Sequence, residues 1–600
     1  MSESRAGRWL VGIGLIWLST MLGPTPLAWA QGEPEAQRST TPATREDLRV
    51  ELEAPDGVRP LLERHLRVLN RSDHAAPESM GDRIALLRRT RNEVIDLLAT
   101  EGYFTPAIDF ERASRTRWTL NVDPGPRTRV ASVVIEFEGH LAEDDAAAER
   151  RAALREGWSL PEGEAFRQGD WDGAKSELLY GVSVRDYAAA SITHSRAVVD
   201  PDTAEVRLAV TVDSGPPFRL GALNINGIER LPENLVHRYS ALEEGERYDH
   251  DRLLAFQSSL QNAPQFAAVV VDVDRDRDAA DATPVHVYVS EADSRHLSFG
   301  AGYSTNTGAR AEMNWRNVNW RQRGWELSTG IRLEQRRQSV YADMFLPPSG
   351  QGYRDSFGAL AESSDIEGLR IARQAVGGVR LRRRGDIETS IGLRYQREQL
   401  RPRGAERSSR NALTANWTWT QRKVDDVLDP RRGYVAQFEL GGGAEALLSD
   451  QDFVRTYGRL VRYQPVGERD VFILRGEAGA TFADSREGIP QDFLFRTGGA
   501  QTVRGYAYSS LGVDEGDAVL GGRYLGVVSA EYVHWFKPQW GVAAFVDAGD
   551  AADERSDFSP KVGYGVGARW RSPAGPIALD LAYGQEDRRL RVHFSVAIAF

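Results

Sequence analysis

A two-residue alternation of polarity is the strongest constraint on the fold, and it runs from about residue 296 to the end of the chain. It is clearest in the last segment, whose apolar face consists of Leu590, Val592, Phe594, Val596, Ile598 and Phe600. Successive side chains of a strand point to opposite faces of a sheet, so this pattern describes a strand with one apolar face. About sixteen such segments, separated by Gly, Asp, Asn and Pro clusters, predict a sixteen-stranded antiparallel transmembrane β-barrel over residues 294–600.

Composition narrows the class of protein. The net charge of −11 argues against a nucleic-acid binder, because neutralising phosphates needs a concentrated basic face. The chain has no cysteine, so no disulfide framework can form. Beyond residue 30 there is no run of 18 apolar residues, which argues against transmembrane helices.

The first residues have the three parts of an export signal. Arg5 and Arg8 supply positive charge, an apolar tract follows, and residues 28–30 form an A-x-A cleavage site. We therefore expect a signal peptide over residues 1–30 and a disordered linker over residues 31–45. The mature protein is expected to work outside the cytoplasm.

Between the linker and the barrel the sequence repeats itself three times. Each unit has an apolar stretch at helical spacing, then an aromatic residue, a strand, a turn and another strand. The connections between the repeats, called joints here, also resemble one another. Gly139 and Gly227 follow matching motifs in two of them and are 88 residues apart. We predict three small α+β domains, which span residues 46–124, 125–214 and 215–293.

One long loop carries the most distinctive motif. The segment 484–522 is far longer than a hairpin loop and contains Val503, Arg504, Gly505 and Tyr506 in succession. A loop of this size that folds back into the barrel could bring its arginine to carboxylates on the inner wall. The candidate partners are Asp547, which shares a face with Phe545 and Gly549, and Glu531 on the preceding strand.

These motifs resemble the BamA/TamA outer-membrane assembly superfamily. The resemblance rests on the V-R-G-Y motif at 503–506, the F-x-D-x-G motif at 545–549, the D-P-R-R-G-Y motif at 429–434 and the terminal Phe600. It implies three β-α-α-β-β POTRA repeats before a sixteen-stranded barrel, with the long loop in the lumen. The number of repeats resembles TamA more than BamA or the two-partner secretion transporters.

The resemblance also implies a function. A closed barrel has no free edge, so an assembly factor must open one for a client strand. The seam between the first and last strands is the natural place, because inward glycines weaken the first strand. The seam residues that we expect to matter are Phe299, Gly300, Gly302, Phe594 and Phe600.

The implied partners are unfolded outer-membrane proteins such as autotransporters, outer-membrane lipid and an inner-membrane-anchored protein similar to TamB. The location would be the outer membrane of a Gram-negative bacterium, with the repeats in the periplasm. The alternative function is a transport pore of the two-partner secretion type, with substrate passing through the lumen.

Motifs for catalysis, cofactors and metals are weak. The Gly563-x-Gly-x-Gly567 run lies within an alternating strand and does not open a helix, so it is typical of close backbone approach in a barrel. No H-E-x-x-H or G-x-S-x-G motif occurs. We therefore expect no catalytic residue, no cofactor and no metal.

Overall fold

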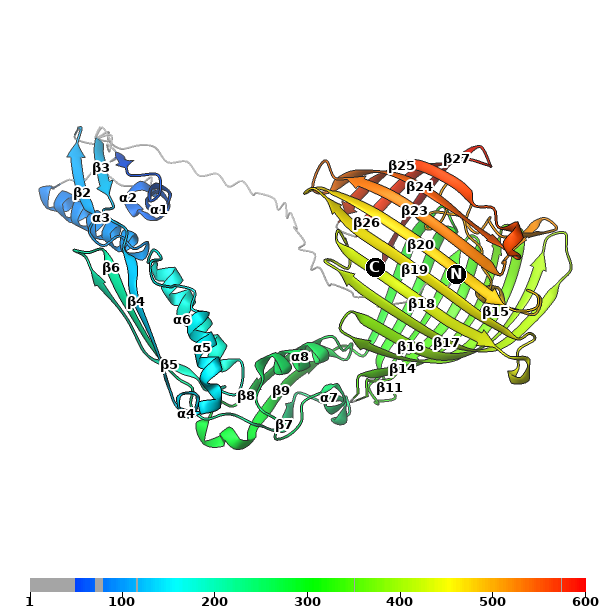
Figure 1. The fold of residues 1–600 in the computed structure, drawn as a ribbon, viewed down its shortest axis with the longest axis horizontal. Helices are drawn as coiled ribbons and strands as arrows, with labels where there is room; N and C mark the ends of the chain where they lie inside the picture. Colours follow the sequence, from blue (N-terminus) through cyan, green and yellow to red (C-terminus); the bar gives the residue numbers. More distant parts are fainter. Residues whose placement is uncertain (1–48, 71–78, 115–116, 350, 573–574, 600) are drawn as a thin grey trace, which may run out of the picture.

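The computed structural model describes residues 49–70, 79–114, 117–349, 351–572 and 575–599. An arm of three small α/β units leads to a large closed barrel (Figure 1). The predicted fold class is therefore confirmed. The expected signal peptide, the whole expected linker and Phe600 lie outside the described residues.

Each unit of the arm has a strand, helices and two further strands, in that order. The first unit contains β1 (Arg49–Glu53), α1 (Arg59–His65), α2 (Arg67–Asn70), α3 (Met80–Thr100), β2 (Ala107–Arg112) and β3 (Arg117–Asp123). The second contains β4 (Arg129–Glu138), α4 (His140–Glu143), α5 (Ala148–Glu156), α6 (Gln168–Ser183), β5 (Ser191–Asp200) and β6 (Glu205–Asp213). The third contains β7 (Leu220–Asn226), α7 (Asn234–Tyr239), α8 (His250–Gln261), β8 (Phe266–Val273) and β9 (Thr283–Glu291).

In each unit the last strand lies at the centre of the sheet. It is parallel to the first strand and antiparallel to the second. The helices cover one face, and each unit has a separate apolar core, centred for example on Leu120, Leu208 and Val287. Among the described helices none is long and apolar enough to cross a membrane.

The repeated joints contain glycines in a left-handed backbone conformation. Gly125 and Gly215 have φ of 73° and 63°, and Gly139 and Gly227 have φ of 73° and 92°. A Cβ atom on Gly227 would lie 2.0 Å from the carbonyl oxygen of Val289. Glycine is therefore required there both by the backbone angle and by space.

The barrel consists of sixteen strands, each antiparallel to its neighbours. The first eight are β10 (Arg295–Ser304), β11 (Gly308–Trp320), β12 (Trp325–Glu334), β13 (Arg337–Phe345), β14 (Tyr353–Ile366), β15 (Leu369–Arg384), β16 (Ile387–Pro402) and β17 (Ser408–Val424). The other eight are β18 (Gly433–Gly443), β19 (Phe453–Val466), β20 (Asp470–Phe482), β23 (Tyr524–His534), β24 (Trp540–Ala552), β25 (Lys561–Ser572), β26 (Gly575–Gly584) and β27 (Arg589–Ala599).

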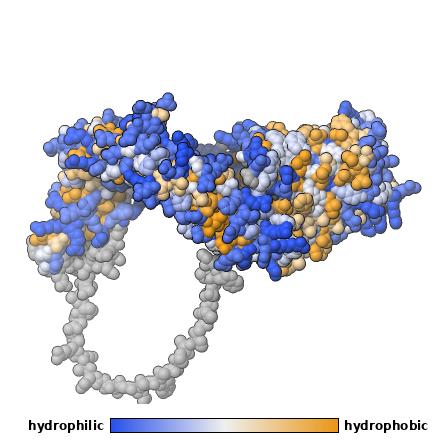
Figure 2. Space-filling view, turned by 90° about the horizontal axis from the view of Figure 1, so that it is seen from below, coloured by the Kyte–Doolittle hydropathy of each residue, from blue (hydrophilic) through white to orange (hydrophobic). Residues whose placement is uncertain are grey.

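The alternation of side chains places apolar residues outside and polar residues inside. On β24, Val542 and Val546 are about half exposed on the outer wall, whereas Phe545 and Asp547 are buried on the inner wall. Hydrophobic residues gather in a band across the barrel, with hydrophilic surface beside it (Figure 2). Trp540 and Trp570 stack on neighbouring strand ends, as expected of an interfacial aromatic.

The third unit contacts the strand turns at one end of the barrel. Arg238 donates hydrogen bonds to the carbonyl oxygens of Pro347 and Pro348, at 3.1 and 3.2 Å. The amide of Gln265 donates to the carbonyl oxygen of Gly324 at 2.7 Å. This end of the barrel is thus the end that faces the arm (Figure 1).

The joint geometry predicts the effect of a single methyl group. Gly227→Ala should destabilise the third unit by about 2 kcal/mol or more, because the new Cβ collides with the backbone at Val289. Hydrogen exchange of β9 in the full-length protein measures this effect. Gly245→Ala is the control, since Gly245 also has a positive φ of 84° but open space around its Cβ. Equal exchange in the two variants would contradict the steric explanation.

Candidate functional site: the plug and the inner wall

The segment 484–522, named the plug here, lies between β20 and β23. It contains a short 3-10 helix (Gln491–Phe493) and a hairpin of β21 (Val513–Glu515) and β22 (Ala518–Leu520). Polar and apolar contacts attach it to the inner wall on two sides of the barrel. The sequence indicated a long loop but not the hairpin.

The tip of the plug places Arg504 against Asp547. The guanidinium Nε donates to Asp547 Oδ2 at 2.7 Å, and Nη2 donates to Oδ1 at 2.9 Å. The backbone N–H of Arg504 also donates to Oδ2, at 3.0 Å. Asp547 is fully buried and Arg504 is 4% exposed, so the pair is bidentate and removed from water.

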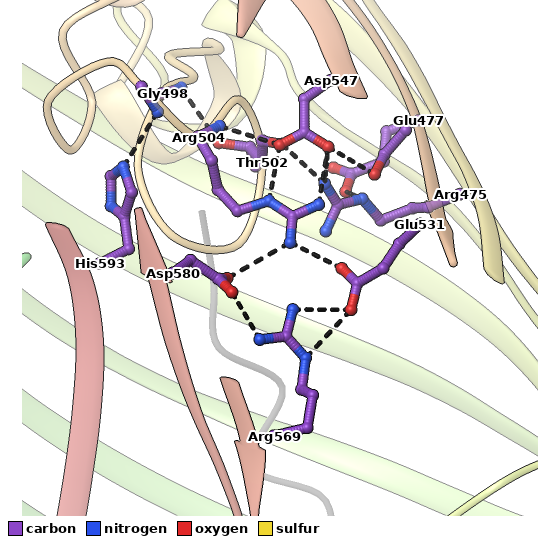
Figure 3. Close-up of polar contacts among 12 residues, drawn as sticks. Arg475, Glu477, Gly498, Thr502, Arg504, Glu531, Asp547, Arg569, Asp580 and His593 are labelled. Carbon is purple, nitrogen blue, oxygen red and sulfur yellow. Dashed lines mark hydrogen bonds and ion pairs between the residues drawn. The ribbon is translucent and has the colours of Figure 1, made fainter. Parts of the chain in front are cut away.

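Two further carboxylates complete the surroundings of the guanidinium. Nη1 of Arg504 lies 2.6 Å from Glu531 and 3.3 Å from Asp580 (Figure 3). Arg569 bonds to both of these carboxylates from the other side. Arg475 on β20 lies 4.0 Å from Asp547 and 3.7 Å from Glu477 (Figure 3), so three guanidiniums and four carboxylates, on five neighbouring strands and the plug, form one connected network.

Other groups support this arrangement. Ser529 donates to Asp547 at 2.6 Å, and the guanidinium carbon of Arg504 lies 3.5 Å from the centre of the Phe545 ring. Burial alone would lower the pKa of Arg504, but the hydrogen bonds and charge of Asp547 outweigh burial and raise the pKa above its ordinary value. The arginine therefore stays charged.

The next two residues of the motif bind the last strands of the barrel. The N–H of Gly505 donates to Nε2 of His593 on β27 at 3.0 Å. The hydroxyl of Tyr506 donates to the carbonyl oxygen of Val562 at 3.1 Å and accepts from the N–H of Glu586 at 3.2 Å. Val503 and Tyr506 are buried and pack with Leu511 and Val527, which together form a small apolar core under the tip.

A stripe of three glycines on β25 makes room for the network. A Cβ atom would lie 1.8 Å from the carbonyl oxygen of Arg504 at Gly563, 2.7 Å from the Phe545 ring at Gly565 and 1.9 Å from Asp580 at Gly567. The close approach that the sequence indicated for this run is thus present. Its purpose, which the sequence did not indicate, is to let the plug reach the wall.

A second anchor holds the plug to the strands β15 to β17. Arg373 lies 2.7 Å from Asp492 of the plug and 2.6 Å from Glu398 of the wall. The N–H of Gln491 donates to Glu398 at 2.8 Å. The hairpin of the plug packs its apolar side chains on the same strands, in a core that consists of Leu369, Ile371, Leu400, Ala518 and Leu520.

The seam between β10 and β27 is short. Five residues of each strand, 300–304 and 595–599, pair there, whereas β15 and β16 pair over sixteen residues each. Within the described strands, residues 295–299 of β10 pair with β11 and have no partner across the seam. Phe299 is 54% exposed on the outer wall, Gly300 faces inward against Glu312, and Phe594 is partly buried.

The sequence reasoning named the motif and two of its three acidic neighbours. The structure brings Arg504, Asp547, Glu531 and Phe545 together, and it places Gly549 two residues from Asp547 on the same inner face. The sequence reasoning did not name Asp580, Arg569 or His593 as part of the network. The alternation of the sequence indicates that these side chains point inward. Their convergence on one point depends on the register of five strands, which the alternation does not give.

The family is defined by comparison of the sequence with known families. The model of the Omp85 superfamily domain matches residues 295–600. This chain belongs to the Omp85 superfamily. It is an outer-membrane protein whose POTRA repeats lie in the periplasm.

The solved structure of a BamA protein shares the fold. BamA from Haemophilus ducreyi lacking POTRA domains 1–3 superposes with a TM-score of 0.67 at 15% identity, covering 79% of this chain and 100% of that chain. CdiB from Acinetobacter baumannii gives a TM-score of 0.46 at 13% identity, covering 86% of this chain and 98% of that chain. Family membership places this chain among transport and assembly proteins.

Removing the plug arginine should destabilise the barrel. Arg504→Ala leaves buried Asp547 with only Arg475, 4.0 Å away, as a countercharge, which costs up to about 3–5 kcal/mol. Asp547→Ala should have a similar effect. The measurement is the temperature at which the purified barrel loses its folded migration in SDS gels. Arg407→Ala, an exposed turn arginine, is the control, and a melting point unchanged in Arg504→Ala would refute the pairing.

Filling the glycine stripe should displace the plug without removing any charge. In Gly563→Ala the new Cβ occupies the position of the Arg504 carbonyl oxygen, so the tip must withdraw. We expect the conductance in planar bilayers to rise by about tenfold as the lumen opens. Gly476→Ala, in a strand position with nothing within 4 Å, is the matched control. A closed Gly563→Ala channel would show that the tip tolerates the methyl group.

Proposed function

We propose that this protein assembles client β-barrel proteins in the outer membrane through its lateral seam. The observation that carries the proposal is the short pairing of β10 with β27, which leaves part of β10 without a partner in the described strands. Unpaired backbone groups are expensive in lipid, so such an edge favours the arrival of another strand. A client strand that pairs with β10 would satisfy these groups.

The attachments of the plug support opening at this seam. The hydrogen bonds of its tip go to β23, β24, β26 and β27 and to the backbone at Val562 and Glu586, all on the C-terminal side of the seam. Strand β27 can therefore move away from β10 together with the tip, while the charge network stays intact. Opening then requires breaking only the short seam pairing and the neighbouring bonds of Thr305 to Phe594.

The POTRA repeats supply the periplasmic part of the proposal. Each three-stranded sheet ends in two outer strands, with the last strand of the unit between them. An extended segment of a client, or of an inner-membrane-anchored partner similar to TamB, can pair with such an edge. Three repeats favour a TamA-like role. Autotransporters are the client class that this role implies.

The competing function is a pore of the two-partner secretion type. It requires substrate to pass through the lumen, where the plug is anchored to both β15–β17 and β23–β27. Transport through the lumen would have to break both anchors. The seam route breaks neither, which is why we favour assembly.

Locking the seam should block assembly. The chain has no cysteine, so a pair introduced at Gly302 and Ala597, which are opposite each other across the seam, can be oxidised without side reactions. We expect the oxidised variant to lose most insertion of client barrels into proteoliposomes, and reduction to restore it.

The control for this experiment is a cross-link between β10 and β11. Ala301 and Ala311 are paired on these strands, so cysteines there tie the same strand without closing the seam. Full activity of the Gly302–Ala597 cross-link would end the seam proposal. Large substrate-dependent conductance through the locked barrel would instead support the pore.

A further inference from the structure

The outer wall of the barrel has a shallow hollow of about 490 Å³ across β12 to β16. Two rows of paired residues form it. Val340, Ala361, Gln374 and Arg397 are consecutive neighbours across four strands, and Gln338, Ser363, Ala372 and Gln399 form the adjacent row. Val340 is 53% exposed, so these rows point away from the lumen and toward lipid.

The hollow lies at the end of the barrel opposite the arm. The turns at Glu367 and Arg403, just beyond it, hydrogen-bond to the plug hairpin. The arm contacts the other end, at Pro347 and Gly324. Because the POTRA repeats are periplasmic, the hollow faces the outer leaflet. Its polar rows lie beside the exposed apolar side chains of Val376, Ile391 and Leu393.

Positive charge gathers at the hollow. Arg397 lines it, and Arg370 and Arg401 are paired opposite each other one row beyond. Asp365 neutralises Arg370 at 3.1 Å. In the ranges that the structure describes, Arg397 and Arg401 form no ion pair, so two guanidiniums beside a membrane surface have no countercharge. Guanidinium pairs match phosphate in charge and in hydrogen-bond geometry.

The floor of the hollow suits acyl chains beside a polar head. Ala361 and Ala372 have small side chains, so the wall is depressed at their positions. Leu333 and Val340 border the depression with apolar surface. Gln374 and Gln399 add amide donors and acceptors of the kind that bind sugar hydroxyls. A phosphate, a sugar and several acyl chains occur together in the glycolipid of the outer leaflet, whereas phosphatidylglycerol carries no sugar.

We propose that this hollow is a binding site for phosphorylated lipopolysaccharide of the outer leaflet. Arg397 and Arg401, four residues apart on β16, bind phosphates of the headgroup, the glutamines bind its sugar, and acyl chains lie on the small residues and the apolar border. This site would hold the lipid at β13–β16, on a part of the wall away from the seam.

The test is retention of purified lipopolysaccharide by the full-length protein after exchange into detergent. Arg397→Gln/Arg401→Gln should lower retention by about tenfold, because both phosphate ligands lose their charge. Arg382→Gln/Arg384→Gln, on the outer face of the same strand pair at the arm end, should leave it unchanged. Ala372→Leu should also lower retention, because it fills the floor without changing charge. Folded migration in SDS gels verifies that each variant retains its barrel.

Two further probes make the proposal specific. Dephosphorylated lipopolysaccharide should bind about tenfold more weakly to the wild-type protein, and phosphatidylglycerol should fail to displace the phosphorylated form. Equal retention by wild-type protein and Arg397→Gln/Arg401→Gln would overturn the proposal. Equal binding of the dephosphorylated lipid would overturn the role of the arginines, and displacement by phosphatidylglycerol would overturn the choice of a glycolipid.

Discussion

Pairing of buried charge inside the lumen is the interaction on which the rest of this barrel depends. An ion removed from water costs several kcal/mol unless a partner and hydrogen bonds replace the solvent. Asp547 is fully buried, and it accepts bonds from Arg504, from the backbone of the plug and from Ser529. Without the plug, Asp547 would keep only Arg475, 4.0 Å away, and Glu531 and Asp580 would share Arg569 alone. Plug and wall are therefore stable only together.

The two anchors of the plug explain why a segment as long as 484–522 can have one position in a wide barrel. The tip is bound to strands near the seam, and the 3-10 helix and hairpin are bound to β15–β17. Each anchor combines an arginine, buried carboxylates and an apolar contact. A plug held at both sides spans the lumen and leaves the seam as the weakest junction of the wall.

Much of this could be predicted from sequence, because period-2 alternation and repeats are local signals. The alternating segment expected at the end of the chain forms β27, and parity alone placed Asp547 on the inner face. Convergence could not be predicted in the same way. Asp580 is one of many inward charges, and only the register of closed neighbouring strands brings it to Arg504.

The short seam and the second anchor were also beyond the sequence. The offset between first and last strands follows from the shear of the closed barrel, which no single segment encodes. Asp492 of the plug meets Arg373, a residue more than one hundred positions earlier, through folding of a loop without a periodic pattern. Non-local pairings of this kind leave no local trace.

The glycine stripe on β25 has a mechanical consequence. Side chains that interlock across neighbouring strands stiffen a sheet, and Gly563, Gly565 and Gly567 contribute none on the inner face. The wall is therefore more easily bent at β25, two strands from β27, where it accommodates the plug. The three glycines that make room for the plug therefore also allow the sheet to bend along β25, so that the C-terminal edge of the barrel can move.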